Sequence, residues 1–344
     1  MHYNLAVFVG RFQPFHLGHQ YVVQRALAMA DDVLIMIGSS FEPRSMRNPW
    51  TFDEREAMIR ACFSDAENRR ILCKPLMDIR YSDTLWLSQV QKEVYRICPH
   101  DGAKITLIGQ HDGGQGYYTS LFPQWDANGV ERVEDVSGKA ICRHLLKGGS
   151  VKDLDGQVDS AILPFLSKFM ASKAGLNLCD EYEFVETYKK GWENAPFAPT
   201  HVTVDTVVIQ SGHILMVERG AQPGKGLWAL PGGFIQHDET LVNAAIRKLR
   251  EETKIKVPAP VLHGSIKQHV VFDAPFRSTR GRTITHAFHI ELRNEDALPK
   301  VKGGGETSKC FWLPLGRLDS SMMFEDHYFI IQKILGTGTV GVVD

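Results

Sequence analysis

The sequence predicts an α/β protein of two domains: an N-terminal, doubly wound parallel sheet of the Rossmann-like type, and a C-terminal α+β sandwich. Three observations lead to this prediction. Short apolar runs alternate with helical periodicity through the first half, a proline-containing break follows, and the remainder is rich in β-forming residues. The length of 344 residues also exceeds that of one average domain. We expect domains at 1–190 and 201–344, joined by a linker at 191–200.

Strands and helices alternate along the first domain. Helical periodicity later continues from about 138 to 190. Thr51 with Glu54 three residues on forms a capping-box signal for the start of one helix. The expected strands are Leu5–Val9, Val33–Ile37, Ile71–Leu76 and Lys104–Ile108, and the expected helices are 20–30, 52–63 and 84–97. This alternation is typical of a parallel sheet with helical crossovers.

The second domain begins after Pro196 and Pro199, which mark the linker. Ser211-Gly212 between two β-rich runs is a hairpin signal. A strong helix lies between strands, and another closes the chain. The expected strands are Val202–Ile209, Ile214–Glu218 and Arg282–Leu292, and the expected helices are 239–253 and 327–335.

Composition excludes several classes of partner. The chain is 43% apolar and 23% charged, with a net charge of −1, so we expect neither a nucleic-acid nor a membrane-surface partner. No apolar run approaches the ~18 residues of a membrane span, and no signal-peptide pattern precedes the first strand. The six cysteines are scattered without a CxxC pair. They indicate thiols in a reducing compartment, so we expect a cytoplasmic protein.

The most informative segment is Gly10-Arg11-Phe12-Gln13-Pro14-Phe15-His16-Leu17-Gly18-His19, the decapeptide hereafter. It lies between a predicted strand and a predicted helix, where a parallel sheet normally places ligands. Its glycines allow the backbone to approach a ligand. Its histidines and arginine supply donors beside the free N–H groups of a helix N-terminus. The decapeptide therefore predicts a phosphate site.

This combination resembles the nucleotidyltransferases with an HxGH signature, and the Gly-Arg-Phe-Gln-Pro lead-in resembles the archaeal-type nicotinamide mononucleotide (NMN) adenylyltransferases. The resemblance implies transfer of the adenylyl group of ATP to NMN, which gives NAD and pyrophosphate. Other nucleotide-activated phosphates, such as phosphopantetheine, are the rival substrates. The resemblance assigns His16, His19 and Arg11 to the ATP phosphates as catalytic residues. It also implies a Mg²⁺ ion that bridges phosphate oxygens, with Mn²⁺ as a substitute.

The same resemblance implies a substrate pocket. Arg47 falls at a phosphate-contacting position, and Asp78 and Trp86 fall around the nicotinamide, where an indole face suits a cationic ring. The second phosphate motif corresponds to Ser137 and Arg143, but its usual arginine position holds Cys142, with Lys139 as a substitute charge. The implied binding residues also include Gly10, Phe12, Gly18, Ser39 and Gly109.

The segment from Gly233 resembles the Nudix box, GX5EX7REUXEEXGU, where U is a bulky aliphatic residue. Glutamates on adjacent turns of one helix present carboxylates to divalent ions that grip a diphosphate. Two positions depart from the pattern: Lys248 replaces the first glutamate of the REUXEE core, and Lys254 replaces the glycine. We expect Glu251, Glu252 and Glu306 as catalytic metal ligands, with the Gly233 backbone as a further candidate.

A segment containing Arg277, Arg280 and Arg282 resembles that of Nudix proteins that act on ADP-ribose, and its arginines are candidates for binding a diphosphate or ribose. The implied reaction gives AMP and ribose 5-phosphate. The resemblance therefore extends over nearly the whole chain, to bifunctional NMN adenylyltransferase/Nudix hydrolases. The expected small-molecule partners are ATP, NMN, NAD and ADP-ribose. An alternative stays open because of Lys248: an active transferase whose Nudix domain only binds ADP-ribose or NAD. A homo-oligomer also stays open.

Overall fold

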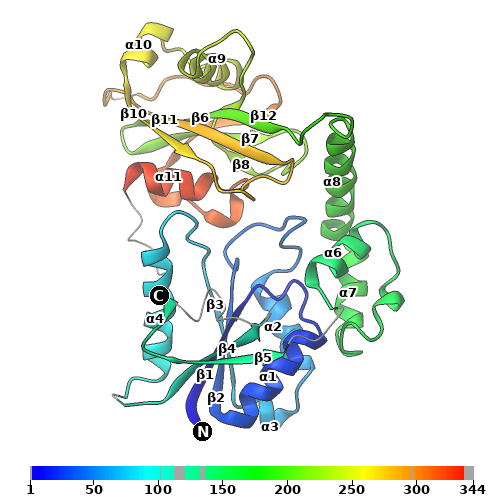
Figure 1. Cartoon of the computed structure of the whole chain (residues 1–344). Coiled ribbons are helices and arrows are strands. Elements are labelled where there is room, and N and C mark those ends of the chain that lie inside the picture. Colours follow the sequence, from blue (N-terminus) through cyan, green and yellow to red (C-terminus); the bar gives the residue numbers. More distant parts are fainter. Residues whose placement is uncertain (1, 101, 112–120, 132–135, 296, 337–344) are drawn as a thin grey trace. The chain divides into compact units, whose positions relative to one another are not determined.

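The structure is a computed structural model that describes residues 2–100, 102–111, 121–131, 136–295 and 297–336. The chain divides into two units, Met1–Tyr182 and Glu183–Asp344, which we describe separately. The division falls inside the helix α8 (Lys173–Lys190) (Figure 1).

The first unit contains a five-stranded sheet in which all strands are parallel, in the order β3-β2-β1-β4-β5. Its strands are β1 (Tyr3–Gly10), β2 (Ala30–Ile37), β3 (Ile71–Pro75), β4 (Ile105–His111) and β5 (Asp126–Glu131). The predicted parallel fold is confirmed. The strand β5 was not predicted, because this edge strand carries only one buried residue, Val130, and so has no apolar run.

Helices cover both faces of this sheet. Alternate residues of β1 point to opposite sides: Ala6 and Phe8 join the core that includes α1 and α2, whereas Leu5 and Val7 join the core that includes α4. The helical elements are α1 (Leu17–Met29), α2 (Phe52–Ala61), α3 (Asp65–Asn68), α4 (Asp83–Ile97), α6 (Gly138–Leu146), η1 (Val151–Leu154) and α7 (Leu163–Met170). The predicted capping box is present, since Thr51 and Glu54 exchange hydrogen bonds at the start of α2.

The second unit is built on a mixed sheet with a main strand order of β10-β11-β6-β7-β12, while β8 pairs with β7 and β9 with β6. Ser211 and Gly212 join β6 and β7 with positive φ at both positions, as the hairpin signal predicts. The strands are β6 (Thr200–Gln210), β7 (His213–Arg219), β8 (Trp228–Ala229), β9 (Gly232–Phe234), β10 (Ile266–Phe272), β11 (Arg282–Glu291) and β12 (Thr307–Pro314).

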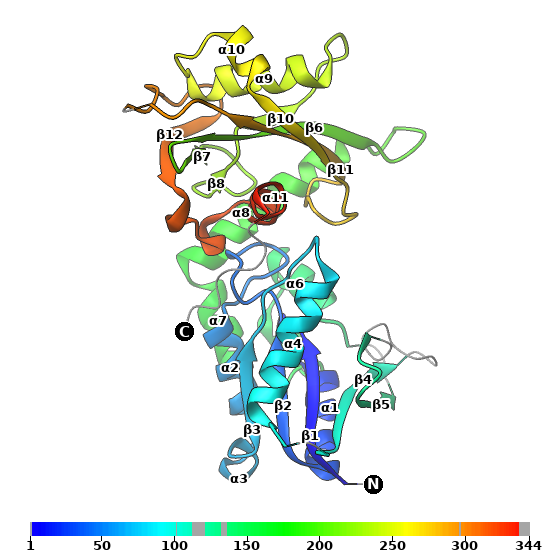
Figure 2. The ribbon, with the colours of Figure 1, turned by 90° about the vertical axis from the view of Figure 1, so that its left-hand side faces the viewer.

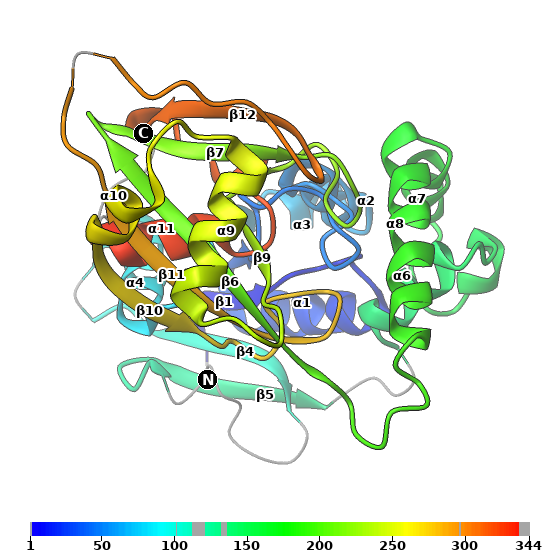
Figure 3. The same ribbon diagram turned by 90° about the horizontal axis from the view of Figure 1, so that it is seen from above.

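Helices α9 (Leu241–Thr253) and α11 (His327–Leu335) lie on opposite faces of this sheet (Figure 2), which confirms the predicted α+β sandwich. Figure 3 shows α9 lying across β6 and β11. Ala244 and Ala245 pack against Val204 and Phe288 there. The other helical elements are α10 (Ala259–Gly264), η2 (Leu315–Arg317) and η3 (Ser320–Met322).

The end of α9 explains one departure from the Nudix pattern. Lys254 is the C-cap in the left-handed conformation, with φ of 47°, and its N–H donates to the carbonyl of Arg250. Glycine adopts this conformation without strain, and other residues adopt it at a modest cost. The helix therefore ends where the box predicts, despite the substitution.

Within the described ranges, no helix combines the length and the apolar character needed to cross a membrane.

Candidate active sites

The decapeptide connects β1 to α1 and places its two histidines against each other. His16 is the N-cap of α1, and its ring stacks on that of His19 with centroids 3.6 Å apart. Phe12 and Phe15 are buried and surround His19 at 4.9 Å and 5.7 Å. Phe12 has a φ of 51°, and its ring fills the space that a Cβ on Gly10 would need, at 2.7 Å. Gly10 is thus required by packing.

The surroundings keep His19 neutral. Its ring is partly exposed, but Nδ1 is buried and bonds to no described residue. Burial lowers the pKa of His19 well below its usual value, and the neighbouring His16 lowers it further. A neutral imidazole here can accept a proton or donate a hydrogen bond when an anionic ligand supplies the compensating charge.

Helix α6 packs directly on the decapeptide, so the two predicted phosphate motifs lie together. A Cβ on Gly138 would come within 2.8 Å of the Gln13 carbonyl oxygen. The same oxygen accepts a hydrogen bond from the Cys142 thiol at 3.2 Å. Ser137 occupies the N-cap position of α6, without a side-chain capping hydrogen bond. Cys142 therefore faces the decapeptide, whereas Arg143, about 100° further around the helix, is exposed.

The segment after β2 carries a second group of candidates. Ser39, with a φ of 50°, donates its N–H and its hydroxyl to Asp78 at 3.0 Å and 2.5 Å. Arg47 is exposed, yet desolvation of its guanidinium, followed by the charges of Arg11 and Arg80, lowers its pKa. Three arginines thus lie close enough to repel one another. Such a group favours binding of an anion such as a phosphate.

Sequence reasoning missed Arg55, whose buried guanidinium fixes this region. It donates to the carbonyls of Arg11 at 2.6 Å and Gly38 at 2.7 Å, which follow β1 and β2, and to that of Thr51 at 3.1 Å. Burial lowers the pKa of Arg55 to about 10. A signal existed in the sequence: Arg55 shares the apolar face of its helix with Met58 and Ile59.

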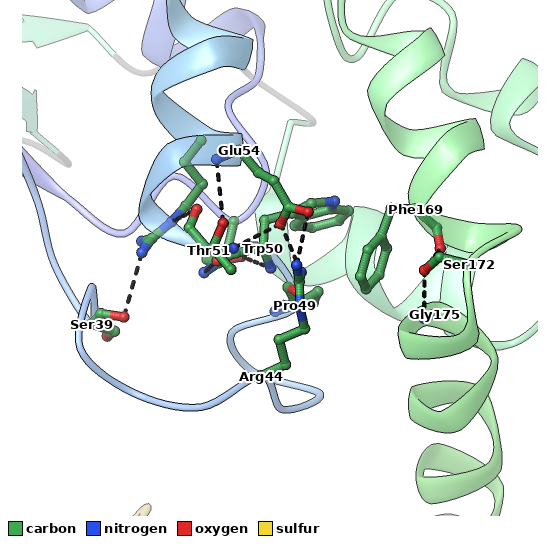
Figure 4. A network of polar contacts seen from close by, with 11 residues as sticks. Ser39, Arg44, Pro49, Trp50, Thr51, Glu54, Phe169, Ser172 and Gly175 are labelled. Atoms are coloured by element: carbon green, nitrogen blue, oxygen red, sulfur yellow. Dashed lines mark hydrogen bonds and ion pairs between the residues drawn. The ribbon is translucent and has the colours of Figure 1, made fainter. Parts of the chain in front are cut away.

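Arg44 fixes the other end of the segment. It donates to both carboxylate oxygens of Glu54, at 2.7 Å and 2.8 Å, and to the carbonyl of Pro49. Its guanidinium also lies over the Phe169 ring, 5.3 Å from the centroid (Figure 4). Arg44 therefore connects the segment to α2 and α7.

Two further candidates lie on other elements. Trp86, on the first turn of α4, is half-buried and packs near Phe122, with ring centroids 6.2 Å apart. Gly109 lies on β4, and a Cβ there would meet nothing within 4 Å. Contacts of Trp86 with nicotinamide and of Gly109 with nucleotide stay predictions.

In the second unit, the box helix α9 carries a chain of ion pairs. Arg247 donates to Glu239 at 2.5 Å and 2.8 Å and to Glu251 at 3.1 Å. These hydrogen bonds lower the pKa of Glu239 to about 2. The Lys248 ammonium lies 3.7 Å from Glu251. Glu251 therefore already has two cationic neighbours.

Glu252 has a different environment. It is partly buried, and its Oε2 accepts a hydrogen bond from the N–H of Gly232 at 3.0 Å. Burial raises the pKa of Glu252 to about 7, although the charges of Lys248 and Arg219 act in the opposite direction. Its Oε1 accepts no hydrogen bond from the described residues, which leaves a carboxylate oxygen open to a ligand.

Glu306 lies on a segment that packs against the end of α9. The N–H of Gly304 donates to the Glu252 carbonyl at 2.9 Å, and the N–H of Lys302 donates to that of Thr253 at 2.8 Å. Arg219, which sequence reasoning missed, lies near both Glu252 and Glu306. Its guanidinium stacks on Phe324 at 4.0 Å.

The three arginines of the predicted diphosphate segment differ in their contacts. Arg277 is buried and donates twice to Asp326, at 2.9 Å and 2.8 Å, so its contact with a diphosphate stays a prediction. Arg282 donates to the Asp273 carbonyl. Arg280 lies over the Phe234 ring at 5.1 Å, and its Nε donates to no described residue. Arg280 is thus the best placed of the three to bind a ligand.

An open hollow of about 950 Å³ lies between the outer face of α9 and α10. It is lined by Arg250, Lys254 and His263, and it shares Arg247 and Glu251 with the ion-pair chain. Because Lys248 and Glu252 do not line it, the hollow is separate from the open carboxylate oxygen.

The donor set of the second unit fits a divalent cation in part. Carboxylate oxygens are the ligands that Mg²⁺ and Mn²⁺ prefer, and Glu252 keeps one of them open. In the described part of the chain, however, no three His, Cys, Asp or Glu side chains are gathered closely enough to hold an ion. The expected metal ligands Glu251, Glu252 and Glu306 are thus not gathered around one point, because Glu251 forms ion pairs with Arg247 and Lys248.

These folds and sites define the class of the protein: a nucleotidyltransferase unit joined to a Nudix unit. The cytidylyltransferase-like family model matches residues 7–90, and the NUDIX domain model matches residues 199–333. The chain is 31% identical over 180 residues to a nicotinamide/nicotinic acid mononucleotide adenylyltransferase of Acinetobacter baylyi, covering 52% of this chain and 94% of that protein. It is 30% identical over 134 residues to an ADP-ribose pyrophosphatase of Methanocaldococcus jannaschii, covering 39% and 72%.

The similarity to solved structures extends over nearly the whole chain. The bifunctional NMN adenylyltransferase/ADP-ribose pyrophosphatase of Francisella tularensis, in complex with AMP and a manganese ion, shares 35% identity and a TM-score of 0.91, covering 98% of this chain and 99% of that one. The chain belongs to this family of bifunctional NMN adenylyltransferase/ADP-ribose pyrophosphatases.

Proposed function

We propose that the first unit makes NAD and pyrophosphate from NMN and ATP, and that the second unit hydrolyses ADP-ribose to AMP and ribose 5-phosphate. Family membership supports both activities. The observation that carries the first is the stacked pair of His16 and His19 at the N-terminus of α1, with α6 packed beside it. The observation that carries the proposed hydrolysis of ADP-ribose is the box helix α9, on which one carboxylate oxygen of Glu252 is open to a ligand.

The transferase step needs no covalent enzyme intermediate. The phosphate oxygen of NMN attacks the α-phosphorus of ATP, the new P–O bond forms, and the bond to pyrophosphate breaks. Catalysis is then positioning and neutralisation of the charge on the transferred and leaving groups. His16, His19 and Arg11 contact the triphosphate in this proposal, with the N–H groups of α1 beside them. Mg²⁺ would be held largely by phosphate oxygens and water.

The other residues of the first unit position NMN. Arg47 binds its phosphate, while Asp78 and Trp86 surround the nicotinamide. Asp78 is held by two hydrogen bonds from Ser39, so its carboxylate is fixed before the substrate arrives. Because the usual arginine is replaced by Cys142, we assign its charge to Arg11, which lies close enough to act on the Cys142 thiol.

In the second unit, Glu252, with Glu251 and Glu306, would hold a divalent ion, Mg²⁺ or Mn²⁺. When bound, that ion would polarise the diphosphate and lower the pKa of a water molecule. Arg280 binds the substrate diphosphate or ribose over the Phe234 ring. The alternative of a Nudix unit that only binds ADP-ribose or NAD is less favoured, because relatives of both units are named as enzymes.

A paired assay on the full chain tests both activities. With ATP, Mg²⁺ and NMN, we expect equal amounts of NAD and pyrophosphate. With ADP-ribose and Mg²⁺, we expect AMP and ribose 5-phosphate, and none when EDTA is added. Absence of NAD formation would refute the transferase, and ADP-ribose that is bound but not cleaved would favour the alternative.

A further inference from the structure

Lys248 occupies a position at the centre of the second site. Its side chain is 27% exposed and extends along the backbone of Gly233, so that a Cβ there would lie 3.1 Å from Cε and 3.5 Å from Nζ. Gly233 has a φ of 153°. The lysine stem thus lies against the first residue of the box, whose backbone is a candidate ligand, and the ammonium is directed toward the site.

The ammonium interacts with two acids of the helix and with one acid that precedes it. Nζ is 3.7 Å from Glu251, and its charge also acts on Glu252 and Glu239. At 3.7 Å the pair with Glu251 is loose, and Glu251 has a closer partner in Arg247 at 3.1 Å. Lys248 can therefore leave Glu251 for a stronger anion without leaving that carboxylate unpaired.

Lysine at this position changes the charge balance of the site. With every group ionised, glutamates at 248, 251 and 252 would carry a formal charge of −3, whereas Lys248, Glu251 and Glu252 carry a formal charge of −1. A site whose net charge is less negative by two attracts fewer divalent ions, because each ion needs compensating anionic ligands. The same change attracts a diphosphate more strongly, since an ammonium supplies three donors and a positive charge.

We propose that the Lys248 ammonium takes the place of one divalent ion in the second unit and donates directly to the diphosphate of the bound dinucleotide. This inference rests on the proposed ADP-ribose site, and it makes Lys248 a substrate-binding residue. It predicts that the site holds one ion fewer than a box with glutamate at this position, and that some substrate affinity persists without metal.

The first test is the binding of ADP-ribose to the full chain in EDTA, measured by calorimetry. We expect Lys248→Met to weaken this binding by about tenfold or more, the scale of one lost charge-assisted hydrogen bond, and Lys248→Arg to retain most of it. Arg250→Met is the matched control, because Arg250 is an exposed cation on the outer face of the same helix. ADP-ribose bound in the first unit contributes equally to all variants.

The second test counts Mn²⁺ by electron paramagnetic resonance in the presence of an ADP-ribose analogue with a methylene-bridged, uncleavable diphosphate. We expect Lys248→Glu to bind one more Mn²⁺ per chain than the wild type, and Lys248→Met to bind the same number as the wild type. Urea denaturation of each variant, compared with that of the wild type, verifies that the second unit is folded.

The outcomes separate this inference from the proposed hydrolysis. Three results would each overturn the inference about Lys248. The first is equal metal-free affinity of the wild type and Lys248→Met, and the second is no metal-free binding by the wild type. The third is an equal Mn²⁺ count in the wild type and Lys248→Glu. Failure to cleave ADP-ribose with Mg²⁺ would instead refute the hydrolase while leaving these binding and counting results to decide the role of Lys248.

Discussion

The two sites are held in different ways. In the first unit, backbone contacts fix the site: Arg55 donates to the carbonyls that follow β1 and β2, and Gly138 and Cys142 pack on the Gln13 carbonyl. In the second unit, side chains that are partly exposed fix each other, through the ion pairs of Arg247 with Glu239 and Glu251.

The difference explains which site can tolerate substitution. A site fixed by buried backbone contacts loses its shape when one contact is removed, because a buried polar group without a partner is costly. A site fixed by exposed ion pairs can rearrange, because each pair contributes little and water can replace a partner. The second site accordingly carries a change as large as Lys248. The first site carries its own departure, Cys142, in a residue that keeps a hydrogen bond to the Gln13 carbonyl.

The largest effect should come from removing Arg55. Arg55→Met leaves several buried carbonyls without a donor, so we expect the free energy of unfolding of the first unit to fall by about 3 kcal/mol. The matched change, Arg247→Met, removes partly exposed ion pairs and should cost about 1 kcal/mol or less. Urea denaturation measures the loss in free energy of unfolding of both variants. NAD formation serves as the probe of the first unit, and tryptophan fluorescence serves as the probe of the whole chain. Equal losses in the two variants would contradict the comparison.

The next effect concerns catalysis in the first site alone. His19→Ala removes a positioned stabiliser of phosphate charge, and we expect kcat for NAD formation to fall by about a hundredfold. Hydrolysis of ADP-ribose by the same variant should be unchanged, which shows that the effect is confined to the first unit. An unchanged urea denaturation curve serves as the control for folding. A loss of less than about tenfold would be incompatible with the proposed role of His19.

Much of the fold follows from local pattern. The strands from Leu5–Val9 to Lys104–Ile108, the Ser211-Gly212 hairpin and the box helix are all found where periodicity and turn residues predict them. The edge strands β5, β10 and β12 were missed because each of them buries only one residue. The short β8 and β9 were missed because they have too few residues to show a period.

The sites were predictable only where a motif is continuous in sequence. The histidine pair lies within one turn, so its spacing revealed it. Arg55 was missed because its partners are carbonyls, which leave no trace in the side-chain sequence. Arg219 was missed because it reaches Glu252 and Glu306 through tertiary packing. The engagement of Arg277 with Asp326 likewise depends on a residue about fifty positions away.

A smaller effect should come from Glu306. Glu306→Gln removes one exposed carboxylate near Arg219, and we expect ADP-ribose hydrolysis to fall by about tenfold, with a higher requirement for Mg²⁺. NAD formation should not change. Glu295→Gln, an exposed acid before β12, is the matched control. Unchanged hydrolysis across a Mg²⁺ titration would exclude Glu306 from the site.

The smallest effect is a proton taken up by the first site. Burial and His16 lower the pKa of His19, so at pH 7.5 the free protein holds this ring neutral. A bound triphosphate adds negative charge beside the ring and raises its pKa again, because an adjacent anion favours the protonated form. ATP binding without NMN should therefore take up a fraction of a proton, seen by calorimetry as a heat that varies with the ionisation enthalpy of the buffer. The uptake should decrease as the pH rises further and should be lost in His19→Ala. A buffer-independent heat in the wild type would mean that His19 does not face the triphosphate. The contrast between the two sites would then fail, since it holds that His19 in the first site becomes charged only when the ligand binds, whereas the second site carries the Lys248 ammonium without a ligand.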